Sequence, residues 1–125
     1  MLTDQQLSLA RQLDLVFREI SDELAHMSSG CVFIQIRNDM IGKFGVRHEP
    51  LDTSSAEEVK KQKGLNEQQR YAFRKMAIRA LEHKKNWTHG EIQFDFALKK
   101  GVLHTSVQFE SNYNMANLLQ GRTRN

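Results

Sequence analysis

The chain has 125 residues, of which 39% are hydrophobic and 26% are charged. This size and balance are typical of one globular domain and exclude a fibrous or a largely disordered protein. The formal net charge of +3 is unevenly spread, since residues 1–62 carry a balance of −3 and residues 63–125 a balance of +6.

The first predicted element is a helix of about 25 residues, which precedes Gly30. Thr3 is a suitable N-cap, and Gln6 completes a capping box three residues later. Gly30 is expected to end the helix, because glycine adopts a left-handed conformation without a Cβ clash. One apolar stripe recurs every three or four residues and consists of Leu9, Leu13, Val16, Ile20, Leu24 and Met27.

A β-hairpin is predicted next, with strands over residues 31–37 and 40–48. Asn38 and Asp39 lie between the strands and tolerate the positive φ of a tight turn. Gly42 and Gly45 indicate a bulge or a close backbone approach in the second strand. The residues expected on the core face are Val32, Ile34 and Ile36, opposed by Met40, Phe44 and Val46.

Residues 49–64 are polar and contain the only proline of the chain. Two interpretations are open for this segment. Ser54 and Glu57 can cap a short helix that ends at Gly64, or the segment can be a surface connection.

A second helix is predicted from Leu65 to Asn86, with Asn66 and Gln69 as its capping box. Its apolar face consists of Phe73, Met76, Ala77, Ala80 and Leu81. Its remaining surface is basic and carries Arg70, Arg74, Lys75, Arg79, Lys84 and Lys85.

A second hairpin follows, with its turn at Lys100 and Gly101. The alternation expected of half-buried strands places Ile92, Phe94, Phe96 and Leu98 on the core face, together with Leu103, Thr105, Val107 and Phe109. A last helical turn is expected through Met115, Leu118 and Leu119, followed by a frayed basic tail over residues 120–125.

This order of elements predicts a single α+β domain over residues 1–125, built from two αββ units in tandem. We expect an antiparallel sheet of about four strands, with two helices packed on one face.

The sequence offers little support for catalysis or for a metal site. The five histidines and Cys31 show no spacing typical of metal ligands, and we expect no metal and no cofactor. Asp95 and His104 on the polar face of the second hairpin are a possible acid–base pair. Polar residues on an exposed strand face also serve solubility alone, so we expect the protein not to be an enzyme.

Trp87 is the only tryptophan and lies between the second helix and the second hairpin. The favoured interpretation is a corner residue that closes the core, with its indole N–H near the surface. The alternative is a ring on which a ligand stacks.

The compartment is predicted from what the sequence lacks. No stretch approaches 18 consecutive apolar residues, so we expect no membrane span. The first twelve residues have no basic region before an apolar run, and the single cysteine excludes an internal disulfide. We therefore expect a cytoplasmic protein.

The segment from Leu65 to Glu110 resembles the YezG-like family of bacterial immunity proteins. The resemblance rests on a helix followed by Trp87 and Thr88, in the stretch "NWT", and on a hairpin with Gly101 at its turn. The first helix and its hairpin also match the layout of that family. The resemblance implies a small cytosolic protein that binds and neutralises a cognate toxin, typically a nuclease.

The predicted function is therefore that of a protein-binding module, an inhibitor of a toxin or effector. The residues expected to contact the partner are Arg70, Arg74, Arg79, Glu91, Gln93, Asp95, His104 and Gln108. A nucleic-acid-associated regulator that uses the basic helix is one alternative, and a secretion-type chaperone that dimerises is another. The sequence leaves the oligomeric state open.

Overall fold

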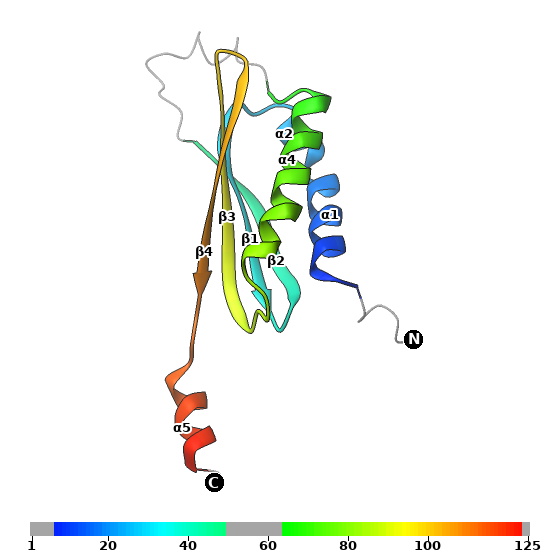
Figure 1. Ribbon diagram of the computed structural model, residues 1–125. Helices are drawn as coiled ribbons and strands as arrows, with labels where there is room; N and C mark the ends of the chain where they lie inside the picture. The colour runs from blue at the N-terminus through cyan, green and yellow to red at the C-terminus, as the bar shows by residue number, and fades with distance from the viewer. Residues whose placement is uncertain (1–6, 50–63, 124–125) are drawn as a thin grey trace.

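The computed structural model describes residues 7–49 and 64–123 (Figure 1). The predicted caps Thr3 and Gln6, and the possible short helix at Ser54, lie outside the described residues. The described elements, in chain order, are α1 (Leu9–Glu19), α2 (Ser21–Leu24), β1 (Ser29–Arg37), β2 (Met40–His48), α4 (Glu67–Ala80), the 3₁₀ turn η3 (Leu81–His83), β3 (His89–Lys99), β4 (Val102–Ser111) and α5 (Met115–Thr123).

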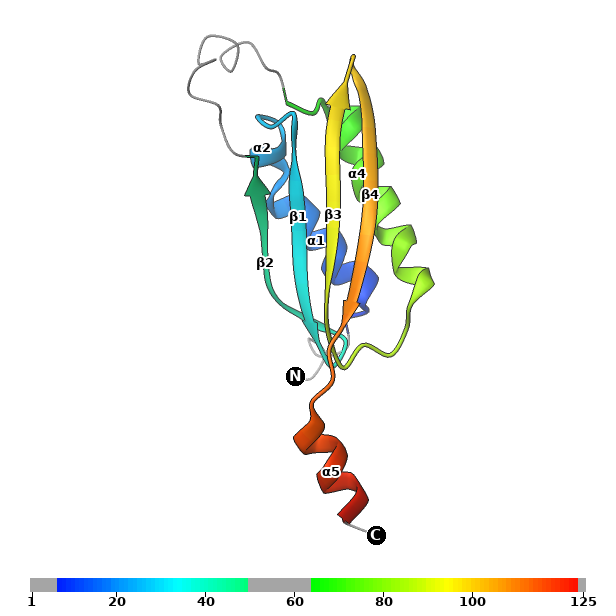
Figure 2. The ribbon, with the colours of Figure 1, turned by 90° about the vertical axis from the view of Figure 1, so that its left-hand side faces the viewer.

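The strands form one antiparallel sheet in the order β2-β1-β3-β4. Helices α1 and α4 lie side by side on one face of this sheet, and the opposite face carries no helix in the described part of the chain (Figures 1 and 2). The two central strands come from different αββ units, because β1 pairs with β3. The predicted α+β fold with two helices on one face is confirmed.

The first helix is shorter than predicted. It begins at Leu9, where the Ser8 side chain accepts a hydrogen bond from the backbone N–H of Arg11 at 3.2 Å. It ends at Glu19 with Ile20 as its C-cap, and the chain resumes as the four-residue helix α2. Ile20 and Leu24 are both in the core, where they are 6% and 1% exposed. The prediction that Gly30 ends the helix was also wrong, because this residue lies inside β1.

Both hairpin turns were predicted correctly. Asn38 and Asp39 have φ values of 51° and 61°, and Lys100 and Gly101 have values of 52° and 77°. Positive φ at both central residues is the mark of a type I′ turn, whose twist matches that of the flanking strands.

The bulge indicated by the glycines of β2 is also present. The register between β1 and β2 shifts between Ile34 and Ile36, so that Ile36 lies opposite Ile41. This shift corrects the predicted core position of Met40. Met40 lies opposite Arg37 instead and is 43% exposed.

Helix α4 has the predicted capping box. The backbone N–H of Gln69 donates to Asn66 Oδ1 at 2.7 Å, and the backbone N–H of Asn66 donates to Gln69 Oε1 at 2.9 Å. Its buried face packs Phe73 edge-on against Phe17 of α1, with ring centroids 5.0 Å apart. Phe73 also contacts Phe96 of β3 at 5.2 Å, so one aromatic cluster joins both helices to the sheet.

Trp87 closes the core below α4, as predicted, but its polar atom does not lie near the surface. The residue is only 2% exposed, and Nε1 is buried without a hydrogen-bond partner in the described structure. Lys84 places its ammonium group 4.7 Å from the ring centroid. The predicted exposed N–H was therefore wrong.

The last element, α5, extends away from the sheet and helices (Figures 1 and 2). Its apolar residues Met115, Leu118 and Leu119 are 65%, 50% and 54% exposed. The predicted last helical turn is present, but the helix continues to Thr123, into the segment that was expected to be frayed.

Candidate functional site

The uncovered face of the sheet gathers five of the eight residues that the sequence predicted for partner contact. These are Glu91, Gln93, Asp95, His104 and Gln108, which alternate with core residues along β3 and β4. The register places Gln93 directly opposite Gln108. We call this surface the open face, and Figure 2 looks onto it.

Glu91 is the centre of a polar network on the open face. Its carboxylate accepts hydrogen bonds from Gln93 Nε2 at 2.7 Å and from Gln35 Nε2 at 3.2 Å. The guanidinium of Arg47 approaches it at 3.9 Å. Side chains from three strands therefore hold one carboxylate in a fixed orientation.

Phe33 and Arg47 form a stacked pair beside this network. The Arg47 guanidinium carbon lies 4.2 Å from the centroid of the Phe33 ring. The same ring lies against Gly45, since a Cβ atom at that position would come within 2.8 Å of the ring. The absence of a side chain on Gly45 therefore lets the aromatic ring lie across β2.

Cys31 and Asp95 occupy neighbouring positions on β1 and β3, with Arg47 on the far side of Cys31. Burial raises the pKa of the Cys31 thiol above its ordinary value, and the nearby Asp95 carboxylate raises it further. Arg47 acts in the opposite direction but more weakly. The thiol is consequently a poor nucleophile near neutral pH.

The predicted acid–base pair does not align across the hairpin. Asp95 lies opposite Ser106, and His104 lies opposite Ala97. Both side chains line one hollow of about 340 Å³ at the upper end of the open face, together with Lys99.

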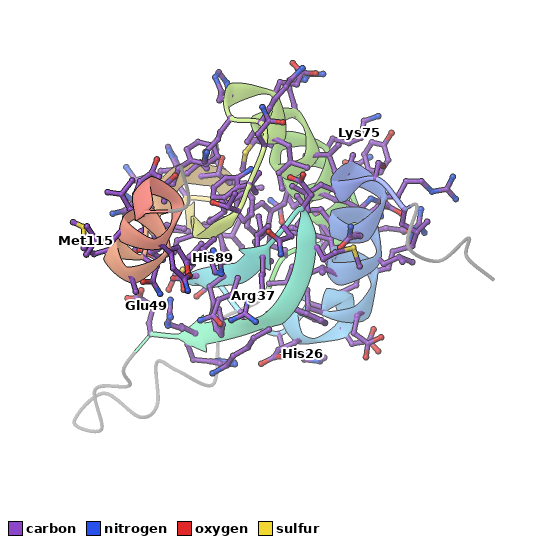
Figure 3. All side chains as sticks on the ribbon, turned by 90° about the horizontal axis from the view of Figure 1, so that it is seen from below. His26, Arg37, Glu49, Lys75, His89 and Met115 are labelled. Atoms are coloured by element: carbon purple, nitrogen blue, oxygen red, sulfur yellow. The ribbon has the colours of Figure 1, made fainter. Side chains whose placement is uncertain are left out.

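A larger hollow of about 510 Å³ lies at the lower end of the open face, beside the β-bulge. Arg37, Lys43 and His89 line it, together with Gln35 and Asn112. Arg37 and His89 face each other in the register of β1 and β3 and lie close together in Figure 3. The Glu91 carboxylate lines the same hollow, so the two cations Arg37 and Lys43 face one carboxylate there.

The three predicted arginines lie elsewhere. Arg70, Arg74 and Arg79 belong to α4, on the helix-covered side of the sheet, so they do not form one surface with the hairpin residues. Arg70 donates to the backbone carbonyl of Leu65 at 2.6 Å, and Arg74 pairs with Asp14 of α1 at 3.1 Å. Arg79 is exposed.

Sequence reasoning missed the contributions of Phe33, Gln35 and Arg47. Phe33 and Gln35 alternate with the core residues of β1, so their place on the open face could be derived from strand periodicity. Their contacts with Arg47 and Glu91 depend on the register across three strands, which single-strand periodicity does not give.

Within residues 7–49 and 64–123, no group of three His, Cys, Asp or Glu side chains is placed to hold a metal ion. No helix in the same ranges combines the length and the apolar character needed to cross a membrane.

Comparison with known proteins gives no match to any family model, to any curated protein or to any solved structure. The resemblance to the YezG-like immunity proteins therefore stays a prediction. What the chain itself defines is an α+β domain whose sheet leaves one face open.

Proposed function

We propose that this protein is a non-enzymatic module that recognises a cognate protein through the open face of its sheet. In its most specific form, the proposal is an immunity-type inhibitor that covers the active site of a toxin. The observation that supports it is the ordered group of Phe33, Arg47 and Glu91 on a sheet face without a helical cover.

The chemistry of this group is that of an interface centre. Arginine and large aromatic residues supply a disproportionate share of binding energy in protein interfaces. The contacts within the group fix its side chains before a partner arrives, which lowers the entropic cost of association. Both properties favour protein recognition over a purely solvated surface.

The dimensions of the open face agree with this role. A strand of nine residues at roughly 3.3 Å per residue is about 30 Å long. Four strands spaced about 4.8 Å apart span about 20 Å, so the surface measures about 30 Å by 20 Å. With its side chains, such a surface is of the order of the 800 Å² per partner that a specific complex buries.

The experiment compares three tagged proteins, namely wild type, Arg47→Ala and Arg79→Ala, in pull-downs from native lysate with and without nuclease treatment. Arg79→Ala removes the same charge from an exposed position on the opposite side of the molecule. A protein captured in stoichiometric amount is then purified, and its affinity for each variant is measured by calorimetry.

We expect one-to-one binding that survives the nuclease treatment. Arg47→Ala should weaken the affinity by about tenfold or more, because truncation of a residue at an interface centre typically costs over 1 kcal/mol of binding free energy. Arg79→Ala should bind as the wild type does. For the inhibitor form, co-expression with the captured protein should abolish its toxicity.

Three outcomes contradict the proposal. Equal affinity of wild type and Arg47→Ala would exclude the open face. Capture that vanishes with nuclease would favour the nucleic-acid-associated alternative, and capture of many unfolded clients by a dimer would favour the chaperone.

A further inference from the structure

A second surface of interest lies on the helix-covered side of the molecule, away from the open face. A hollow of about 510 Å³ lies between the end of α1 and the first turns of α4. Three arginines from two helices line it, namely Arg18, Arg70 and Arg74, and Tyr71, Gln68 and Ser21 complete most of its wall.

Two of the arginines are oriented by a single carboxylate. Asp14 Oδ2 accepts a hydrogen bond from Arg18 Nε at 2.8 Å, and Asp14 Oδ1 contacts Arg74 Nε at 3.1 Å. Both contacts use the inner nitrogen of the guanidinium. The terminal nitrogens, which carry four N–H donors in each arginine, therefore stay available for a ligand.

Arg70, the third arginine, is held by a contact that does not neutralise its positive charge. Arg70 Nη1 donates to the backbone carbonyl of Leu65 at 2.6 Å, which is a neutral acceptor. The guanidinium of Arg74 also lies 5.2 Å from the centroid of the Tyr71 ring, a contact that orients the arginine further.

The wall of the hollow therefore has an excess of positive charge. One negative charge, on Asp14, is shared by two guanidiniums, and Arg70 faces no carboxylate within salt-bridge distance in the described structure. Among the described residues, the acid that lines the hollow is Glu67, an exposed residue in the first turn of α4.

We propose that this hollow binds a phosphate group as its dianion, either as inorganic phosphate or as the terminal group of a small phosphate monoester. The planar fork of arginine matches the oxygens of phosphate in a bidentate manner, and the three arginines carry one more charge than Asp14 and Glu67 together. The Tyr71 hydroxyl and the Gln68 amide add uncharged donors. The site is independent of the proposed protein-binding function, since it lies on the other side of the sheet.

The test uses the full chain labelled with ¹⁵N, and it follows the arginine Nε–H resonances during titration with inorganic phosphate at constant ionic strength. Glycerol phosphate serves as the monoester, sodium chloride as the salt control, and a short oligothymidylate as the phosphodiester. We expect saturable shifts of the Arg18 and Arg74 signals, with a dissociation constant of about 1 mM or below.

Four variants locate the site. Arg70→Ala and Arg18→Ala should each weaken phosphate binding about tenfold, because each removes charge-assisted hydrogen bonds. Arg18 has a side chain that is 60% exposed, so its variant keeps the test valid if Arg70→Ala does not fold. Glu67→Gln should tighten binding several-fold by removing the opposing charge, and Arg79→Ala should leave it unchanged.

The proposal is overturned if phosphate produces no saturable shift, or if Arg79→Ala weakens binding as much as Arg18→Ala. Tight binding of the oligothymidylate that depends equally on Arg70 and Arg79 would also overturn it, because that pattern indicates a nucleic-acid surface along the whole helix. A preference for glycerol phosphate over inorganic phosphate would identify the monoester as the source.

Discussion

Gly90 allows the buried Trp87 ring to approach the backbone of β3 closely. A Cβ atom at this position would come within 2.3 Å of the Trp87 ring and within 2.4 Å of the Glu110 carbonyl oxygen. Neither neighbour can easily move, because the ring is buried in the core and the carbonyl belongs to β4. A single hydrogen at this position is therefore a packing requirement.

We expect Gly90→Ala to lower the free energy of unfolding by about 1–3 kcal/mol or more, the usual range for overpacking. Gly42→Ala is the matched control, since a Cβ at Gly42 meets no atom within 4 Å. The control should change stability by no more than about 0.5 kcal/mol. Urea unfolding measures both, and equal stabilities would refute the packing argument.

The thiol of Cys31 gives a prediction about reactivity. Its raised pKa has burial as the main cause and Asp95 as the second, so alkylation by iodoacetamide should be slow at pH 7 and should accelerate only under alkaline conditions. Asp95→Asn should lower the pH midpoint of the reaction, and Arg47→Ala should raise it. A midpoint that neither variant moves would show that burial alone sets the pKa.

At the scale of the elements, Gln12 joins α1 to the first hairpin. It is 8% exposed, and its side-chain oxygen accepts from the backbone N–H of Ile41 at 2.7 Å. Its amide nitrogen donates to the carbonyl of Asp39 at 3.1 Å. The same turn also holds the segment that precedes β3, because Asp39 Oδ1 accepts from the backbone N–H of Trp87 at 2.9 Å.

Replacement of Gln12 by leucine should lower the free energy of unfolding by about 1–3 kcal/mol, because it leaves buried backbone groups without a partner. Gln108→Leu makes the same change at an exposed position of the open face and should stay within about 0.5 kcal/mol of the wild type. Thermal and chemical unfolding report the difference. Similar losses in both variants would mean that the Gln12 bridge contributes nothing specific.

Several elements were predicted from the sequence because their signals are local. The capping box of Asn66, both tight turns and the alternation of the second hairpin each depend on residues close in the chain. The break at Ile20 and the exposure of Met40 were not predicted, because core packing and a register shift between strands decide them.

The same limit applies to the sites. The polar side of the second hairpin could be derived, whereas the stacking of Arg47 on Phe33 and the ion pair of Arg74 with Asp14 require tertiary contacts.

At the scale of the whole molecule, Asp14 connects the two αββ units. It pairs with Arg18 in its own helix and with Arg74 of α4. The hydrogen bond from Arg18 is the main cause of a lowered pKa of Asp14, and the charges of neighbouring arginines lower it further, while burial opposes them.

A pKa that is lower in the folded than in the unfolded chain stabilises the fold above the unfolded pKa, and this stabilisation is lost as the pH falls through the folded pKa. We therefore expect Asp14→Asn to lower the melting temperature at pH 7 and to lower it progressively less in acid, as the pH falls below the ordinary carboxyl value of 3.8 and through the folded pKa of Asp14. Glu82→Gln is the control, because Glu82 is exposed on η3 and makes no salt bridge within the described residues. A difference between wild type and Asp14→Asn that is the same at pH 7 and in acid would contradict the linkage.

The central position of β1 and β3 has a consequence for synthesis on the ribosome. The first unit emerges with β1 unpaired along one edge, and Phe17 of its helix lacks the Phe73 and Phe94 rings that pack against it in the finished core. The pairing partner of β1, which is β3, ends at Lys99, so most of the chain must leave the exit tunnel before the sheet can close. We expect the nascent chain to stay unstructured until then and to fold in one late step after β3 has emerged.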